Sequence, residues 1–168
     1  MELRLANKSD LPQIKSMYRK LIDHMNQNNI AIWDEIYPCE FFQNDIKNNS
    51  LYLLTAENDI AAAFALCESN GGAADLEWKN RNGTAMYIDR LGVNVNFLRQ
   101  GVGGAALKSA MELAKQKNAS CLRLFVVDRN KPAIRLYEKT GFQRAGGIYE
   151  EKIADDFVLR EYGFEIEL

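Results

Sequence analysis

The sequence predicts an α/β fold in which helices cover both faces of a mixed sheet. Strand-like and helix-like segments alternate along the chain, from a short strand at Leu3–Ala6 to a strand within the closing residues 156–168. A nearly continuous apolar run at Cys121–Val127 is typical of a strand buried on both faces. Before it, a strand at Thr84–Val93 and a helical pattern at about Val102–Lys117 complete a β-α-β crossover.

A long helix is predicted after the first strand. Ser9 or Asp10 can cap its start, its first turn tolerates Pro12, and asparagines within residues 26–29 end it. Apolar residues at helical spacing predict its inward face: Leu11, Ile14, Met17, Leu21, Ile22 and Met25.

The next segments predict a short helix and a hairpin. The helix covers Glu40–Lys47, and strands at Leu51–Thr55 and Ile60–Cys67 pair around a turn at residues 58–59. The polar, glycine-rich and asparagine-rich segment Glu68–Gly83 is expected to be a mobile connection.

A last helix and two strands close the predicted fold. The helix covers about Lys131–Lys139 and ends at Gly141, where a glycine can adopt the left-handed cap conformation. A strand at Phe142–Ala145 follows, before the strand of the closing residues.

Composition indicates a globular protein with one domain over residues 1–168. The 168 residues are 47% hydrophobic and 26% charged, which suits a single apolar core. A formal net charge of −2 disfavours a nucleic-acid partner, because phosphate binding leaves a basic surplus on one face.

The cellular compartment is expected to be the cytoplasm, with no membrane partner. No run of about twenty apolar residues is present to span a bilayer, and the opening residues lack a signal-peptide pattern. The widely spaced Cys39, Cys67 and Cys121 indicate reduced thiols without a metal site.

Glycines at the mouth of a helix in FLRQGVGGAAL (residues 97–107) predict a site for an anion. Gly101, Gly103 and Gly104 let backbone N–H groups approach phosphate oxygens, and the helix dipole adds attraction. A nucleoside-triphosphate loop is excluded, because Leu107 stands where such a loop needs a glycine before Lys108.

Two other interpretations of this turn stay open. A dinucleotide fingerprint fits Gly101, Gly103 and Ala106, with Asp128 at the end of the next strand as a ribose-binding acid. The connector between Val93 and the first glycine disfavours it. The glycines could also serve only a tight strand-to-helix turn.

A second motif lies in LRLFVVDRNKPAIRLYEKTGFQRAG (residues 122–146). Asn130 stands seven positions before Tyr137, so both could line one side of the last helix. Asn130 could instead only cap that helix, and Tyr137 could be a core aromatic. Gly141 and Phe142 then turn the chain into a strand.

Together the two motifs resemble the GNAT superfamily of N-acetyltransferases. Members have a strand ending like RLGV, a short connector and Q/R-x-x-G-x-G/A opening a helix, then an asparagine, a tyrosine and a Gly-Phe pair. The resemblance covers most of the chain. It implies a mostly antiparallel central sheet of about six to seven strands and an N-acetyltransferase that uses acetyl-CoA without a metal.

The resemblance also implies the residues that bind coenzyme A. Main-chain groups of Leu91, Gly92 and Val93 would bind the pantetheine and face the thioester carbonyl, and Asn130 would bind the pantetheine arm. The loop that binds the diphosphate would comprise Leu98, Arg99, Gln100, Gly101, Val102, Gly103 and Gly104. Leu98 departs from the Gln or Arg of the pattern, and a register starting at Gln100 restores it.

The chemistry needs a neutral amine, a stabilised carbonyl oxygen and a proton for the departing thiolate. Tyr137 suits the last task, because an unperturbed phenol stays protonated at neutral pH, and the resemblance implies the same role. Asp89 is the first candidate to accept the amine proton, and Glu77 is the second. Trp33 and Tyr37 are candidates to border the acceptor site, with Asp34 and Glu35 beside them, or only to pin a long loop.

The favoured hypothesis is direct attack of an amine on acetyl-CoA in a ternary complex. The alternatives are a non-catalytic module that binds or senses acetyl-CoA and, less favoured, an NAD(P)-binding oxidoreductase. The acceptor, a small molecule or a peptide amine, is not identified by the residues. The apolar C-terminal strands could pair two copies into a homodimer.

Overall fold

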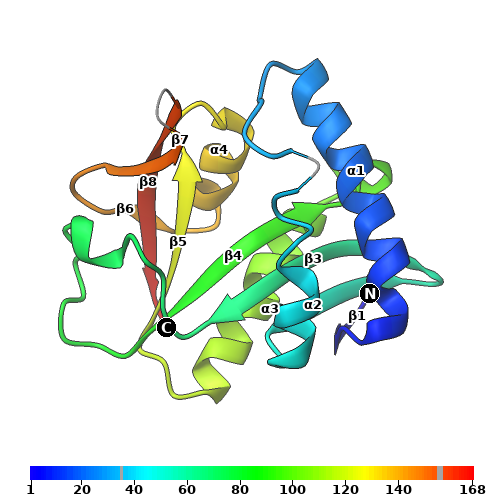
Figure 1. The fold of residues 1–168 in the computed structure, drawn as a ribbon. Helices are drawn as coiled ribbons and strands as arrows, with labels where there is room; N and C mark the ends of the chain where they lie inside the picture. The colour runs from blue at the N-terminus through cyan, green and yellow to red at the C-terminus, as the bar shows by residue number, and fades with distance from the viewer. Residues whose placement is uncertain (35, 155–156) are drawn as a thin grey trace. The chain divides into compact units, whose positions relative to one another are not determined.

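The computed structural model describes residues 1–34, 36–154 and 157–168 (Figure 1). The chain divides into two compact units. The first contains residues 1–66 and 90–109, and the second contains residues 67–89 and 110–168.

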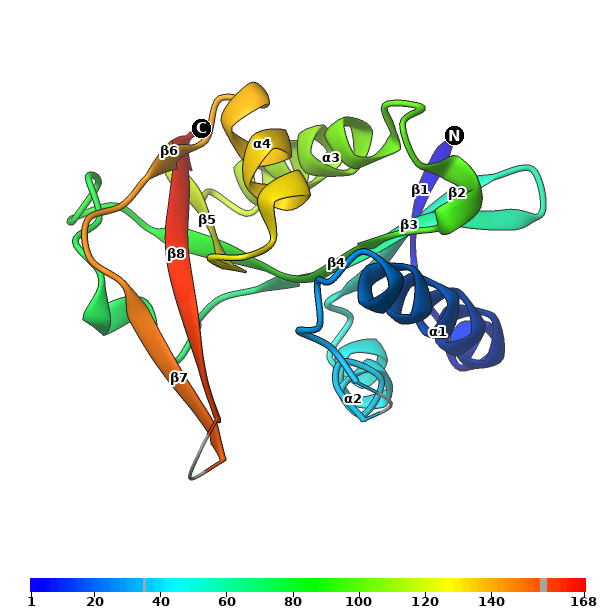
Figure 2. The ribbon, with the colours of Figure 1, turned by 90° about the horizontal axis from the view of Figure 1, so that it is seen from above.

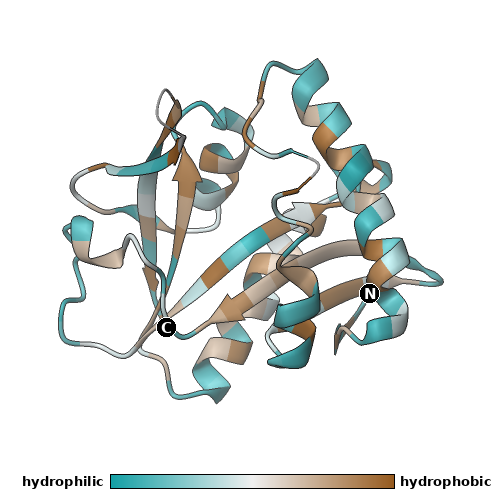
Figure 3. Cartoon of the chain, viewed as in Figure 1, coloured by the Kyte–Doolittle hydropathy of each residue, from teal (hydrophilic) through white to brown (hydrophobic). Residues whose placement is uncertain are grey.

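The sheet of the first unit is built from three antiparallel strands. β2 (Leu51–Ala56) pairs with β1 (Glu2–Leu5) on one side and with β3 (Asp59–Cys67) on the other. The residues of β2 and β3 are almost all buried and apolar, and both strands are coloured as hydrophobic in Figure 3. Their turn lies one residue earlier than predicted, at residues 57–58, where Glu57 takes a left-handed φ of 55°.

Helices α1 (Leu11–Gln27) and α2 (Phe42–Lys47) lie on the same side of these strands (Figure 2). The predicted inward face of α1 is confirmed, except that Leu11 is half-buried and Tyr18 belongs to the buried stripe. Asp10 is the N-cap residue of α1, as one of the two predicted candidates, but its carboxylate makes no capping bond to the helix and binds Arg4 and the Asn7 N–H instead. Asn7 caps the short 3-10 turn before α1.

The sheet of the second unit is centred on β5 (Cys121–Val127). β5 is parallel to β4 (Ala85–Val93) and antiparallel to β8 (Phe157–Glu167). β8 also pairs with β6 (Gln143–Arg144) and β7 (Tyr149–Ala154). Helix α3 (Val102–Gln116) joins β4 to β5, so the predicted β-α-β crossover is confirmed.

Helix α4 (Lys131–Lys139) lies along one face of β5 and β8 (Figure 2). It ends as predicted, with Gly141 at a left-handed φ of 97°. The Gly141 N–H donates to the carbonyl of Glu138, which satisfies one of the last carbonyls of the helix.

The segment Glu68–Gly83 is more ordered than the predicted mobile connection. Leu76 and Trp78 are buried, and the Trp78 indole N–H donates to the Ala73 carbonyl at 2.7 Å. The Arg123 guanidinium lies 4.5 Å from the Trp78 ring. Two large apolar side chains therefore anchor a segment whose composition is mostly polar.

The predicted fold class, a mixed and mostly antiparallel α/β sheet with helices, is confirmed. Within each unit the pairings are antiparallel except for β4 with β5. The described residues form eight strands where about six to seven were expected, and the additional strand is β7. Among the described residues, no helix combines the length and apolar character needed to cross a membrane.

Candidate active site

The parallel ladder between β4 and β5 ends before β5 does. It runs from Ala85 opposite Cys121 to Ile88 opposite Leu124, while β5 continues beside β8 until Val127 lies opposite Glu161. Beyond the ladder, an edge of β5 can offer peptide groups to a ligand. Asp89, the first proposed proton acceptor, is the first residue of β4 past the ladder.

Strand register places the side chains of β5 and β8 on two faces. Residues directly opposite in an antiparallel pair share a face, so Glu161, Gly163 and Glu165 lie on the face of Val127, Phe125 and Arg123. The Arg123–Glu165 ion pair at 2.8 Å and the Trp78 ring against Gly163 mark this face. Phe164 lies on the other face.

Tyr137 lies on the Phe164 face. Its ring centroid is 6.0 Å from that of Phe164 and 6.2 Å from that of Phe142. Burial raises the pKa of the Tyr137 phenol above its ordinary value. The hydroxyl therefore stays protonated across the neutral range.

Three carboxylates lie near one another on the opposite face: Asp89, Glu151 and Glu161. We call these three residues the carboxylate face. Burial raises the pKa of Glu161 to about 7, with further increases from the charges of Glu151 and Asp89. Burial and Asp89 also raise the pKa of Glu151. The Asn70 amide donates to the Asp89 carboxylate at 3.1 Å.

Glu151 and Glu161 are the members of this face that the sequence did not reveal. For Glu161, the signal in the sequence was the alternation of acids at positions 161, 165 and 167 in the last strand. Without the register of β8 against β5 and β7, nothing distinguished a half-buried acid from a solvated one.

The raised pKa of Glu161 predicts a pH-dependent stability. The folded state holds this proton more tightly than the unfolded state, so the stabilisation is complete below the ordinary carboxyl pKa and is lost as pH rises through about 7. Glu161→Gln should raise Tm by several degrees at pH 8 and change it little at pH 4. For a protein of this size, each kcal/mol of stability corresponds to about 2–4 °C in Tm. Scanning calorimetry at both pH values checks this, and an offset independent of pH would contradict it.

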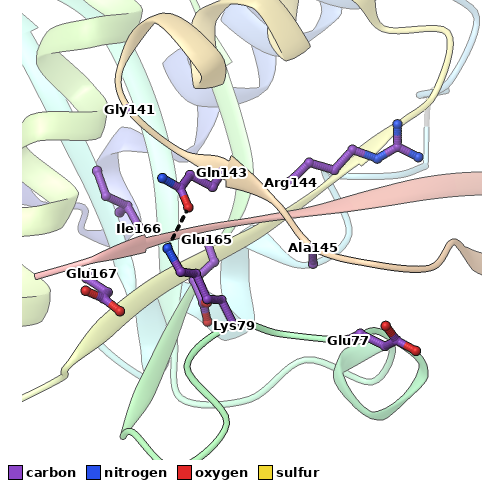
Figure 4. A pocket seen from close by; sticks show the side chains of 9 residues that line it. All are labelled: Glu77, Lys79, Gly141, Gln143, Arg144, Ala145, Glu165, Ile166 and Glu167. Atoms are coloured by element: carbon purple, nitrogen blue, oxygen red, sulfur yellow. Dashed lines mark hydrogen bonds between the residues drawn. The ribbon is translucent and has the colours of Figure 1, made fainter.

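Glu77, the second proposed proton acceptor, lies apart from the carboxylate face. It is exposed and lines a pocket of about 280 Å³ along the Glu165–Glu167 end of β8. In Figure 4 its carboxylate lies at the edge of the residues drawn, while Lys79 donates to Gln143 at 3.1 Å. Asp89 lies instead near Glu161, which precedes Glu167 by six residues on β8.

Trp33 and Tyr37 form an aromatic cluster in the first unit. Ring centroids are 5.8 Å apart for Tyr18 and Trp33, 6.3 Å for Trp33 and Tyr37, and 5.6 Å for Tyr37 and Phe41. The Asp34 carboxylate accepts from the N–H groups of residues 36 and 37. The cluster pins the loop to α1, as one of the two interpretations expected, and Glu35 lies outside the described residues.

The glycine turn contains residues with a left-handed backbone. Gly101 has a left-handed φ of 80°, and Arg99 has one of 61°. A Cβ on Gly104 would meet open space, so packing within the protein does not require glycine there. Val102 is 3% exposed and packs inward, which leaves its main chain as the part able to bind a ligand.

Other predicted cofactor residues have structural partners. The Gln100 side chain donates to the Asn96 carbonyl at 2.9 Å, and Leu98 is half-buried. The Asn130 side-chain oxygen accepts from the Ala133 N–H at 3.3 Å, so it caps α4 as the local interpretation predicted. Its amide NH2 group is the part that remains for a second role.

Arg90 and Gly92, near the end of β4, contact residues of α1 and α2 within the first unit. A Cβ on Gly92 would lie 2.7 Å from the Tyr18 ring, so only glycine fits this close approach. Arg90 has a left-handed φ of 56°, and its guanidinium binds Asp45 with two hydrogen bonds of 2.9 Å. Tyr18, Asp45 and Arg90 were not among the residues selected from the sequence.

Comparison with known proteins identifies the family. Residues 16–142 match the acetyltransferase (GNAT) family. A thialysine N-epsilon-acetyltransferase of Mus musculus is 36% identical over 148 residues, which span 84% of this chain and 83% of that protein. An N-alpha-acetyltransferase of Sulfurisphaera tokodaii is 27% identical over 145 residues, which span 85% of this chain and 87% of that protein.

The fold agrees with solved structures. A GNAT-family acetyltransferase of Streptococcus agalactiae 2603 superposes with a TM-score of 0.82 at 14% identity, covering 99% of this chain and 95% of that one. At such an identity the likeness supports the fold alone, while the family match over residues 16–142 spans both motifs. The chain therefore belongs to the acetyltransferase (GNAT) family and is an N-acetyltransferase.

Proposed function

We propose that this enzyme transfers the acetyl group of acetyl-CoA to a primary amine by direct attack in a ternary complex. Acetyl-CoA supplies an activated thioester whose thiolate must leave as the amide forms. The observation that carries the proposal is the placement of Tyr137 and the carboxylate face on opposite faces of β5 and β8. A proton donor and a proton acceptor can thus serve two different groups.

In this proposal, main-chain groups make most of the contacts that bind the coenzyme. N–H groups from Gly101 to Gly104, at the start of α3, bind the diphosphate, and Arg99 and Gln100 flank them. Main-chain groups of Leu91–Val93 bind the pantetheine and the thioester carbonyl, and the Asn130 amide binds the pantetheine arm. The left-handed backbone at Gly101 and the open space beside Gly104 support these roles.

Tyr137 donates the proton in this mechanism. Its phenol is protonated at neutral pH, and burial raises its pKa further, so the hydroxyl can donate a hydrogen bond to the sulfur as negative charge develops there. The hydroxyl hydrogen moves to the coenzyme sulfur as the carbon–sulfur bond breaks, and the proton that the nitrogen loses as the amide forms restores the phenol through solvent.

The carboxylate face accepts the proton of the incoming ammonium. An alkyl ammonium has a pKa of about 10.4, and an acceptor whose pKa lies near the working pH is the most effective. Glu161, with a pKa of about 7, meets this condition, and Asp89 and Glu151 add negative charge that attracts a cation. The two relatives are named for acetylation of ε- and α-nitrogen atoms, which fits an amine acceptor.

A cytoplasmic location and a homodimer remain predictions. None of the three cysteines forms a disulfide within the described residues, as suits a reducing compartment. Sedimentation of the purified protein would test the homodimer.

Substitution of Gly104 tests the diphosphate loop. Gly104→Ala should leave Tm unchanged or raised, because its Cβ meets open space within a helix. The methyl group should nevertheless obstruct the diphosphate and weaken acetyl-CoA binding by about tenfold, or ~1.4 kcal/mol. Calorimetric titration measures this affinity, with Gly71→Ala as the control because its Cβ also meets open space. An unchanged affinity for Gly104→Ala would contradict the assignment.

Thiol release over a panel of primary amines tests the function itself. We expect acetyl-CoA-dependent thiol release with at least one amine, together with an acetylated product by mass spectrometry. Saturable acetyl-CoA binding without turnover on any amine would favour the non-catalytic module. Thermal stabilisation by NAD or NADP, and not by acetyl-CoA, would favour the oxidoreductase.

A further inference from the structure

We propose that the buried hydroxyl of Tyr18 positions the Arg90–Leu91 peptide of β4 so that the Leu91 N–H is aimed for acetyl transfer. The inference rests on the proposed function, in which main-chain groups of Leu91–Val93 bind the thioester carbonyl. It adds a positioning residue from α1, an element that neither motif includes. All of the residues concerned belong to the first unit.

Tyr18 binds main-chain carbonyls of two strands. Its side chain is fully buried at 0% exposure, and its hydroxyl donates to the carbonyl of Arg90, with the Ala63 carbonyl 3.2 Å away. Burial raises the pKa of this phenol, so the hydroxyl keeps its hydrogen across the neutral range. Because it carries only one hydrogen, the shorter contact identifies the Arg90 carbonyl as its main acceptor.

The peptide that follows Arg90 has an unusual direction for a strand. Arg90 has a φ of 56°, a left-handed conformation that costs a non-glycine residue about 1–2 kcal/mol. A cost of this size requires contacts that hold the residue in place. One of them is the Tyr18 hydroxyl on the carbonyl.

The second contact fixes the Arg90 side chain. Its Nε and Nη2 atoms each donate to the Asp45 carboxylate at 2.9 Å, and both side chains are more than nine-tenths buried. The guanidinium also lies 5.2 Å from the Phe41 ring. Helix α1 therefore holds the main chain of Arg90 while α2 holds its side chain.

Peptide geometry converts these contacts into the direction of one N–H group. The Arg90–Leu91 bond is trans, and in a planar trans peptide the C=O and N–H point in opposite directions. Since the Arg90 carbonyl points at Tyr18, the Leu91 N–H points away from α1. The Tyr18 ring meanwhile lies so close to Gly92 that any Cβ would be only 2.7 Å from it, which fixes the strand at the next residue too.

Tyr18→Phe tests the role of the hydroxyl, because the ring that packs on Gly92 is retained. We expect kcat to fall by about ten- to a hundredfold, in line with the loss of alignment of one oxyanion donor, while the KM for the amine stays unchanged. The matched control is Tyr52→Phe, a buried tyrosine of β2 that stacks on Phe64 at 5.7 Å, and we expect its kcat to remain near wild type. A Tyr18→Phe enzyme with wild-type kcat overturns the proposal, even if its Tm is lower.

A second pair of variants separates positioning from simple stability. Arg90→Gly and Arg90→Ala both remove the partner of Asp45, but only glycine adopts the left-handed φ without strain. With Tyr18 intact, Arg90→Gly should retain several-fold more kcat than Arg90→Ala. Equal kcat values would overturn the proposal. The proposed function fails separately, if the wild-type enzyme itself releases no thiol with any amine.

Discussion

Tyr137→Phe is expected to lower turnover by roughly one to three orders of magnitude while changing the affinity for acetyl-CoA little. The substitution keeps the ring that packs on Phe142 and Phe164 and removes the hydroxyl group, whose hydrogen we assign to the departing thiolate. Steady-state thiol release gives kcat, and calorimetric titration gives the affinity. The variant should therefore combine a much lower kcat with a nearly unchanged affinity for acetyl-CoA.

Tyr162→Phe is the control for this experiment. Tyr162 lies two residues before Phe164 on β8 and therefore on the same face of the strand. Its ring centroid lies 3.5 Å from the Arg144 guanidinium, a contact that phenylalanine retains. Its turnover should stay near that of the wild type. If Tyr137→Phe also turns over at the wild-type rate, Tyr137 has no part in the chemistry.

The second large effect is expected for Glu161→Gln. Removing a general base reduces rates by about 10²–10⁴-fold, and we expect kcat/KM near neutral pH to fall by about a hundredfold, because Asp89 and Glu151 remain beside the site. Wild-type kcat/KM should rise with pH through about 7, as Glu161 loses its proton, and this inflection should be absent from the variant. A pH-rate profile for each enzyme measures both effects.

Two controls distinguish this inflection from other titrations. Amines of different pKa shift the ionisation of the substrate but leave that of Glu161 in place, so the inflection near 7 should not move with the amine. Glu167→Gln removes an exposed acid from the same face of β8 and should behave as wild type. An inflection that persists in Glu161→Gln would assign it to another group.

Local patterns predicted the elements that local physics determines. The apolar run of β5 and the glycine cap of α4 agree with the structure, because continuous burial and a left-handed φ are visible in single segments. The acetyltransferase family also followed from two local motifs. Each of these features depends on residues that lie close together in the sequence.

The features that were missed depend on tertiary partners. β7 has the sequence YEEKIA, whose polar residues indicate a strand only once β8 provides its ladder. Segment 68–83 was expected to be mobile, since the burial of Leu76 and Trp78 depends on distant strands. The roles that we propose for Glu161 and Tyr18 depend on strand register and on a carbonyl 72 residues away.

A crystal structure with coenzyme A joined through its sulfur to an amine acceptor tests most directly whether Tyr137 and Glu161 act from opposite faces of β5 and β8. We predict that the sulfur lies within hydrogen-bond reach of the Tyr137 hydroxyl and that the amine nitrogen lies on the side of Glu161, directly or through one water. A ligand whose sulfur and nitrogen both lie away from these two groups, or on one face of the strands, would contradict the account.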